Sequence, residues 1–125
     1  MNVQYRDLDS ARHVNNAVYL HYLEDARMEF LKCLCRKYDI DDLDFVVASL
    51  KIDYRSPAAF RERLLVHIHP TKMGQTSWTF DFKITEKKTH RLICDGESVQ
   101  VLYDYGSARK RSINQILRKK LSEWM

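Results

Sequence analysis

The fold of this chain is set by residues 16–38, NAVYLHYLEDARMEFLKCLCRKY, the longest stretch with one regular pattern. Side chains suited to a buried face recur there three or four positions apart: Leu20, Leu23, Ala26, Arg27, Phe30, Leu31 and Leu34. This spacing predicts an amphipathic helix of roughly 20 residues. We expect Asn15 to cap the helix, since its side-chain oxygen can accept a first-turn N–H. The acidic stretch 38–44 is expected to end it.

Strand patterns lie on both sides of this helix. Residues 2–6 alternate like a short strand, and segments 45–54, 63–69, 77–85 and 92–103 are rich in β-branched and aromatic residues. The alternating residues are Leu64, Val66, Ile68, Trp78, Phe80, Phe82, Ile84, Ile93, Val99, Val101 and Tyr103. We interpret the aromatic ones on 77–85 as sheet core or subunit interface. Gly74 and residues 86–89 mark turns. Ser112 is expected to cap a short helix that buries Ile113, Ile116, Leu117 and Leu121.

Four consecutive strands with short links must be largely antiparallel. A single long amphipathic helix has such a sheet as its burial partner. The sequence therefore predicts an α+β protein, with one curved antiparallel sheet of about five strands wrapped around one long helix and a short C-terminal helix. Its 125 residues are expected to form one domain, 1–125.

The composition is that of a globular protein, with 45% apolar and 30% charged residues. No run of about 18 apolar residues predicts a membrane span, and no basic segment followed by an apolar stretch predicts a secretory signal. We therefore expect a cytoplasmic protein. The net charge of +4 is mild, and its surplus in 72–91 and 109–120 suits solvated faces or the phosphates of a nucleotide-bearing ligand. We expect no nucleic-acid partner.

The cysteines and histidines do not predict a metal site. Three scattered cysteines argue against a disulfide framework, so free thiols are expected. His67 and His69 form an H-x-H pattern that could ligate zinc together with His90. No third ligand is placed by spacing, so we interpret the pair as outward-facing polar residues.

Asp7 and Asp9 stand in the polar turn that leads into the helix. A helix N-terminus presents unpaired N–H groups and a partial positive charge, which stabilise a carboxylate and a developing oxyanion. A carboxylate beside free amides can attack an acyl group or activate water. An aspartate before a helix is also a common cap. From the residues alone, both interpretations stay open.

The run YRDLDSARHVNNAVY at 5–19, followed by YLEDAR at 22–27, resembles the signature of hotdog-fold thioesterases. It is similar to the 4-hydroxybenzoyl-CoA thioesterase-like group, which includes acyl-CoA thioesterases of the YbgC and FadM type. DYRSP at 53–57 resembles the family's strand that ends in a proline turn. Gly74 and Ser77 match its Gly-x-x-Ser position, and 96–104 its last long strand. The similarity spans essentially the whole chain.

The resemblance implies an acyl-CoA thioesterase that hydrolyses a thioester to a carboxylic acid and CoA. By position, Asp9 is the catalytic carboxylate, acting as nucleophile or as general base. The backbone N–H near Asn16 lies where the family polarises the thioester carbonyl. His13 and Asn15 are expected to orient the loop or the substrate, and Asp7 to hold the turn. No separate cofactor is implied, because CoA is part of the substrate.

The resemblance also implies substrate contacts for Tyr19, which lines or supports the acyl site, and for Arg12, Pro57, Lys72 and Ser77. The sequence departs from the family pattern in three places. Arg12 stands where the family usually has glycine, and Phe60-Arg61-Glu62 replaces a Gly-Asp turn. In relatives, a basic cluster binds the CoA phosphates. The corresponding residues here are the uncharged Gly74-Gln75-Thr76, with only Lys72 nearby.

The family resemblance implies a homodimer with Asp9 at the dimer interface, often paired into a homotetramer. An acyl-ACP thioesterase is an alternative, with Arg109, Lys110 and Arg111 as the docking patch. A non-catalytic acyl-binding hotdog protein is another, if Arg12 pairs with Asp9 and neutralises it. Glu24 lies about 12 Å along the helix from Asn16. We therefore expect Glu24 to form an ion pair with Arg27 or a partner chain.

Overall fold

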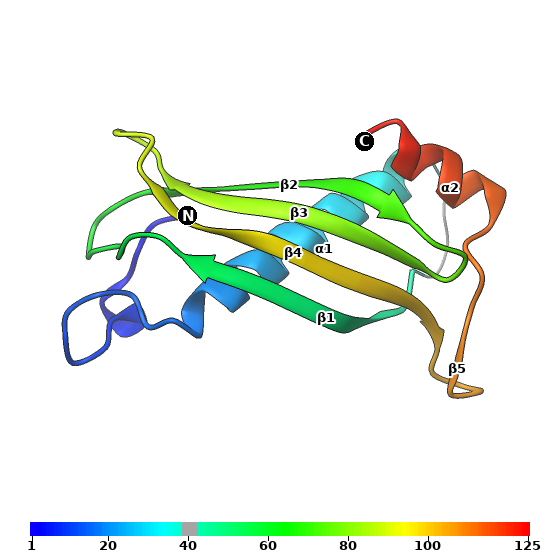
Figure 1. Ribbon diagram of the computed structural model, residues 1–125, viewed down its shortest axis with the longest axis horizontal. Helices are drawn as coiled ribbons and strands as arrows, with labels where there is room; N and C mark the ends of the chain where they lie inside the picture. Colours follow the sequence, from blue (N-terminus) through cyan, green and yellow to red (C-terminus); the bar gives the residue numbers. More distant parts are fainter. Residues whose placement is uncertain (39–42) are drawn as a thin grey trace.

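One long helix lies behind an antiparallel sheet in the computed structural model, which describes residues 1–38 and 43–125 (Figure 1). The main sheet has the strand order β1-β4-β3-β2, and β5 pairs with the end of β4. The elements are the 3₁₀ helix η1 (Tyr5–Asp7), α1 (Val18–Tyr38), β1 (Phe45–Tyr54), β2 (Leu64–Met73), β3 (Ser77–Glu86), β4 (Leu92–Asp104), β5 (Arg109–Lys110) and α2 (Gln115–Ser122). All strand pairs are antiparallel. The predicted α+β hotdog architecture is confirmed.

The core lies between α1 and the inner face of the sheet. Two clusters of buried residues follow the helix, one near its beginning around Leu23 and one near its end around Leu34. The alternation on β3 is confirmed, because Trp78, Phe80, Phe82 and Ile84 are all at most 4% exposed. Figure 1 shows α1 crossing behind the strands diagonally. None of the helices among the described residues is long and apolar enough to cross a membrane.

The predicted N-terminal strand is wrong. Only Asn2 forms a bridge, to Arg63, and residues 5–7 form the 3₁₀ helix. The Asp7 carboxylate accepts the Gln4 N–H at 2.9 Å, and this bond curls the chain away from the sheet. The fifth strand is instead the two-residue β5.

The helix ends differ from expectation in two places. Helix α1 begins at Val18, two residues after the predicted start, and the segment 39–42 of its expected acidic end lies outside the described residues. In α2, Asn114 is the cap rather than Ser112, and its Oδ1 accepts the Leu117 N–H at 2.8 Å. Ile116 is 61% exposed instead of buried. Serine and asparagine are both common helix caps, so cap preference alone did not distinguish Ser112 from Asn114.

The alternation expected on β4 is only partly observed, since Ile93 and Val101 are buried. Ser98 and Gln100 are fully buried, whereas Val99 and Tyr103 are partly exposed. A register shift opposite Ile84/Thr85 leaves Ile93 as an extra residue in β4 and changes which β4 residues face inward. The buried side chain of Arg27 on α1 donates to Ser98 Oγ at 3.5 Å. Polar residues thus occupy core positions where apolar alternation predicts none.

The pairing of β1 with β4 depends on Gly96. A Cβ at this position would overlap the carbonyl oxygen of Lys51 on β1. We therefore expect Gly96→Ala to lower the free energy of unfolding by about 1–3 kcal/mol, the usual cost of overpacking. Gly106→Ala is the control, because its nearest atom is the side-chain Oδ1 of Asp104 at 3.3 Å. Denaturant unfolding gives the free energy of unfolding of both variants, and equal values would contradict the close approach at Gly96.

Candidate active site

The loop in front of α1 is a closed hairpin. Leu8 and Val14 form a β-bridge, and the Asp9 N–H donates to the His13 carbonyl at 2.8 Å. The Arg12 N–H donates back to the Asp9 carbonyl at 3.0 Å. This is a three-residue hairpin loop, whose last position takes the left-handed conformation that favours glycine. Arg12 occupies that position with φ 65°. The turn geometry is thus kept although the residue is an arginine.

The Asp9 carboxylate is fixed by this loop and remains exposed. Its Oδ1 accepts the N–H groups of Ala11 at 2.8 Å and of His13 at 3.4 Å. Within the described part of the chain, its Oδ2 has no hydrogen-bond partner. No ion pair joins Arg12 to Asp9 there either. One carboxylate oxygen is therefore oriented and the other is available for chemistry.

Asp7 holds the base of the hairpin. Its Oδ2 accepts the hydroxyl of Tyr22 at 2.7 Å, and its carbonyl accepts the Asn15 N–H at 2.9 Å. Burial, and then the bond to Asp7, raise the pKa of Tyr22, so the hydroxyl keeps its proton. Asp7 thus ties the hairpin to α1 and has less freedom to react than Asp9.

The residues before α1 leave one backbone N–H unused. Asn15 Oδ1 accepts the Ala17 N–H at 2.9 Å, and the Asn15 carbonyl accepts the Val18 N–H at 2.9 Å. The Asn16 carbonyl accepts the Tyr54 hydroxyl at 3.0 Å. Among the described residues, the Asn16 N–H has no acceptor. The peptides around it are held in place, which is the arrangement required of an oxyanion donor.

Tyr54 was missed by sequence reasoning. It ends β1, and its ring lies 5.8 Å from that of Tyr19. Burial raises the pKa of Tyr54, which keeps its hydroxyl a donor to Asn16. Its position in the 53–57 segment was the only signal in the sequence, and it did not indicate a contact with the loop. Contact across 38 residues follows from the tertiary fold.

Tyr19 and His13 lie behind and beside the loop. Tyr19 is 2% exposed, and its hydroxyl accepts the Ala58 N–H at 3.1 Å, next to Pro57. His13 is exposed and forms a β-bridge with Ala59. The hairpin is therefore braced by the segment that follows the proline turn. Tyr19 supports this segment from inside rather than lying on the open surface.

Lys72 and Ser77 do not meet Asp9 within one chain. They lie at the turn between β2 and β3, at the right-hand end of Figure 1, whereas the hairpin loop lies at the left-hand end. Pro57 follows the end of β1 on the hairpin side. One chain thus brings together Asp9, Arg12, His13, Asn15, Asn16, Tyr19 and Pro57, and leaves Lys72 and Ser77 apart.

A cavity of about 390 Å³ opens beside Asp9. It is lined by Tyr5, Leu8, Asp9, Arg12 and Phe60. Asp9 therefore shares this cavity with apolar, aromatic and cationic side chains. This is the concave surface nearest to the predicted chemistry.

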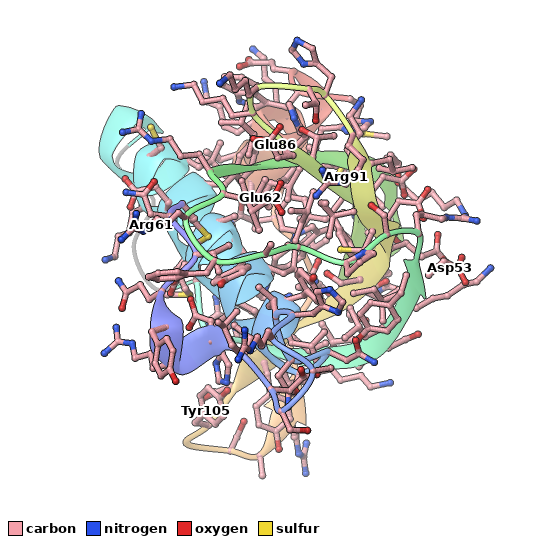
Figure 2. All side chains as sticks on the ribbon, turned by 90° about the vertical axis from the view of Figure 1, so that its left-hand side faces the viewer. Asp53, Arg61, Glu62, Glu86, Arg91 and Tyr105 are labelled. Carbon is pink, nitrogen blue, oxygen red and sulfur yellow. The ribbon has the colours of Figure 1, made fainter. Side chains whose placement is uncertain are left out.

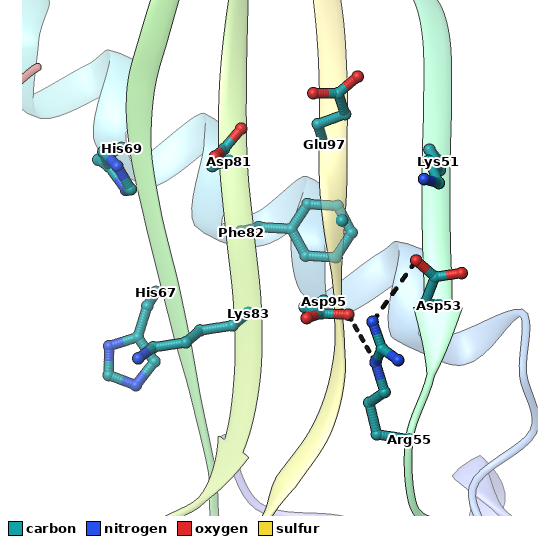
Figure 3. Close-up of a pocket in the computed structure, with 11 residues that line it drawn as sticks. Lys51, Asp53, Arg55, His67, His69, Asp81, Phe82, Lys83, Asp95 and Glu97 are labelled. Atoms are coloured by element: carbon teal, nitrogen blue, oxygen red, sulfur yellow. Dashed lines mark hydrogen bonds and ion pairs between the residues drawn. The ribbon is translucent and has the colours of Figure 1, made fainter.

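A second cavity, of about 500 Å³, lies on the outer face of the sheet (Figure 3). Arg55 forms ion pairs with Asp95 at 3.0 Å and with Asp53 at 3.7 Å, so charges of opposite sign offset one another there. His67 and His69 point outward on this face, as expected. In residues 1–38 and 43–125, no group of three or more His, Cys, Asp or Glu side chains is placed to hold a metal ion. We interpret this surface as a solvated charged face.

The sequence matches the family model described as the thioesterase-like superfamily over residues 3–121. The chain belongs to this superfamily, and it is a thioester hydrolase. It is 28% identical over 118 residues to the long-chain acyl-CoA thioesterase FadM of Escherichia coli, covering 93% of this chain and 89% of that protein. It is 31% identical over 88 residues to the acyl-CoA thioesterase YbgC of Haemophilus influenzae, covering 67% and 65%.

A solved structure shows the same fold. It is a thioesterase from Thermus thermophilus complexed with coenzyme A and Zn. Its TM-score to this chain is 0.83 at 26% identity, and the match covers 99% of this chain and 90% of that one.

Proposed function

We propose that this protein is an acyl-CoA thioesterase that releases a carboxylic acid and CoA. The observation that carries the proposal is that residues 9–16 hold both an Asp9 Oδ2 and an Asn16 N–H that have no partner in the part of the chain that the structure describes. The relatives FadM and YbgC, both named acyl-CoA thioesterases, support the choice of substrate.

Each group has a defined part in the proposed reaction. The Asn16 N–H receives the thioester oxygen as it becomes negative. Asp9 Oδ2 either attacks the carbonyl carbon to form an anhydride, which water then hydrolyses, or removes a proton from an attacking water. The C–S bond breaks, and the CoA sulfur leaves as thiolate and takes up a proton. His13 and Asn15 hold the hairpin and the start of α1 through their backbone and side-chain bonds.

We infer that the working form is a homodimer joined along β1. This strand is an edge of the main sheet, and its side chains Val47, Leu50 and Tyr54 are 43%, 38% and 44% exposed. Edge strands with exposed apolar residues favour pairing with another strand. Antiparallel pairing of β1 with its copy would set the β2–β3 turn of one chain, with Lys72 and Ser77, on the same side as the other chain's hairpin. We further infer, from the family resemblance, that dimers pair into a tetramer.

The proposed compartment is the cytoplasm. The three cysteines are thiols, and Cys33 is exposed, which suits a reducing environment. An acyl-ACP thioesterase is the second candidate, because Arg109 and Lys110 form an exposed basic strand that suits an acidic carrier protein. Parallel assays with acyl-CoA and acyl-ACP of one chain length decide between the two carriers.

Asp9→Asn tests the catalytic assignment. Asparagine keeps an oxygen that can accept the Ala11 and His13 N–H groups, so we expect the fold and assembly to persist. Its amide neither attacks a thioester nor removes a proton from water, so kcat should fall by about 100-fold or more. A screen of thioester hydrolysis over aryl and C2 to C16 acyl-CoAs measures the turnover of the variant and of the wild type. Near-normal turnover by a clean preparation of this variant would falsify the assignment.

Tyr54→Phe tests whether the Asn16 peptide is held for catalysis. Losing the bond to the Asn16 carbonyl should lower kcat by about tenfold and leave KM nearly unchanged, because the loop then orients its N–H less well. Tyr105→Phe is the control, since its hydroxyl donates to the Phe45 carbonyl at 2.9 Å at the other end of β1. Equal kcat values in the two variants would count against this role.

Leu50→Lys tests the dimer contact. A charge in the middle of β1 should convert the dimer to monomer at micromolar concentration, as lysine does on natural edge strands. Leu65→Lys is the control, because Leu65 is 37% exposed on β2. Light scattering after size exclusion gives the masses. Dimeric Leu50→Lys protein would exclude β1 as the interface.

A further inference from the structure

Two arginines occupy backbone conformations that favour glycine. Arg12 has φ 65° at the end of the hairpin loop, and Arg61 has φ 71°. Arg61 is the third residue of a turn in which the Glu62 N–H donates to the Ala59 carbonyl at 3.2 Å. Glycine adopts such positive φ angles without the clash that a Cβ introduces. Both residues therefore add strain that a glycine would avoid, which directs attention to their side chains.

The two arginines border one aromatic surface. The Arg61 guanidinium carbon lies 5.3 Å from the centroid of the Phe60 ring, and that ring packs edge to face with Tyr5 at 6.1 Å. Phe60, Tyr5 and Arg12 line the cavity that contains Asp9. Tyr5 is 79% exposed and Phe60 43%. Figure 2, which looks onto this end of the molecule, shows Arg61 at the outer surface. A continuous surface thus leads from Asp9 past the two rings to Arg61.

The cations on this surface are available to a ligand. Across residues 1–38 and 43–125, neither Arg12 nor Arg61 forms an ion pair. Glu62 follows Arg61 in the sequence, but its carboxylate forms an ion pair with Arg91 at 2.9 Å and accepts the Ala59 N–H. Guanidinium groups bind phosphate oxygens through paired, charge-assisted hydrogen bonds. The exposed rings beside them offer apolar contact to an uncharged chain.

We propose that Arg61 binds the phosphate of the thioester's carrier, with the pantetheine arm lying along Tyr5 and Phe60 and past Arg12. The phosphate belongs either to CoA or to the phosphopantetheine of a carrier protein. This rests on the proposed function for the position of the sulfur at Asp9. In a pantetheine thioester, the reacting sulfur and the phosphate are at opposite ends of one flexible arm. The surface has the same order, with Asp9 at one end and Arg61 at the other.

The proposed phosphate site lies at the hairpin end of the chain. Lys72 lies at the far end of the sheet from Asp9 in the same chain, beside the β2–β3 turn, where Arg118 also donates to the Gly74 carbonyl at 2.9 Å. Arg12 and Arg61 are on the same end as the carboxylate. The proposal therefore assigns carrier recognition to the subunit that contributes Asp9.

Calorimetric binding of CoA tests the proposal without catalysis. The double variant Arg12→Gly, Arg61→Gly should bind CoA at least about tenfold more weakly than the wild type, while its weak binding of pantetheine is unchanged. Its thermal midpoint should not fall, because glycine relieves the backbone strain. Arg12→Gln with Arg61→Gln keeps both Cβ atoms and should give the same loss. Ala108→Gly is the control, since Ala108 also has positive φ, 55°, in the turn between β4 and β5 at the other end of the sheet.

Steady-state kinetics then separate the two phosphate sources. The double glycine variant should raise KM for acyl-CoA and for acyl-phosphopantetheine by a larger factor than KM for acyl-pantetheine. An equal rise with acyl-ACP identifies the carrier protein as a second source of the phosphate.

Unchanged CoA affinity in both double variants overturns the proposal, as does a wild type that binds CoA no better than pantetheine. Turnover of acyl-pantetheine by the wild type, and its loss in Asp9→Asn, decides the proposed function separately.

Discussion

The hydrogen bonds that close the hairpin in front of α1 are the constraint on which the rest of the site depends. The Asp9 N–H meets the His13 carbonyl, and the Asn15 N–H meets the Asp7 carbonyl. Within the loop that they close, the Ala11 and His13 N–H groups fix one oxygen of the Asp9 carboxylate, and the Asn16 N–H has no acceptor among the described residues. Helix α1, which packs one face on the sheet, holds this short exposed segment in place through Tyr19 and Tyr22.

The predicted site residues lie at opposite ends of the sheet, which is why we propose that two chains build one site. The hairpin, Pro57, Arg12 and Arg61 gather at one end, and the β2–β3 turn with Lys72 and Ser77 lies at the other. The exposed edge strand β1 runs between these ends. A two-fold dimer along β1 would place opposite ends of two chains side by side and would cover the apolar residues that β1 exposes.

Much of the fold could be predicted from local patterns. The bounds of β1 and the core alternation of β3 are as expected, because these strands bury one face and carry strong β formers. Prediction failed where a tertiary contact decided the structure. Residues 2–6 curl because Asp7 captures the Gln4 N–H, and β4 buries Ser98 because α1 presents Arg27. Tyr54 and Arg61 could not be placed beside the hairpin by spacing, since the fold alone brings them there.

A crystal structure with an unreactive acyl-CoA analogue, in which a methylene replaces the thioester sulfur, tests the central claim most directly. The account predicts the acyl carbonyl oxygen within about 3 Å of the Asn16 N–H nitrogen, the distance of a hydrogen bond. It also predicts Asp9 Oδ2 facing the carbonyl carbon. An acyl carbonyl bound elsewhere, for example on the charged outer face of the sheet, would contradict the assignment of the hairpin as the active site.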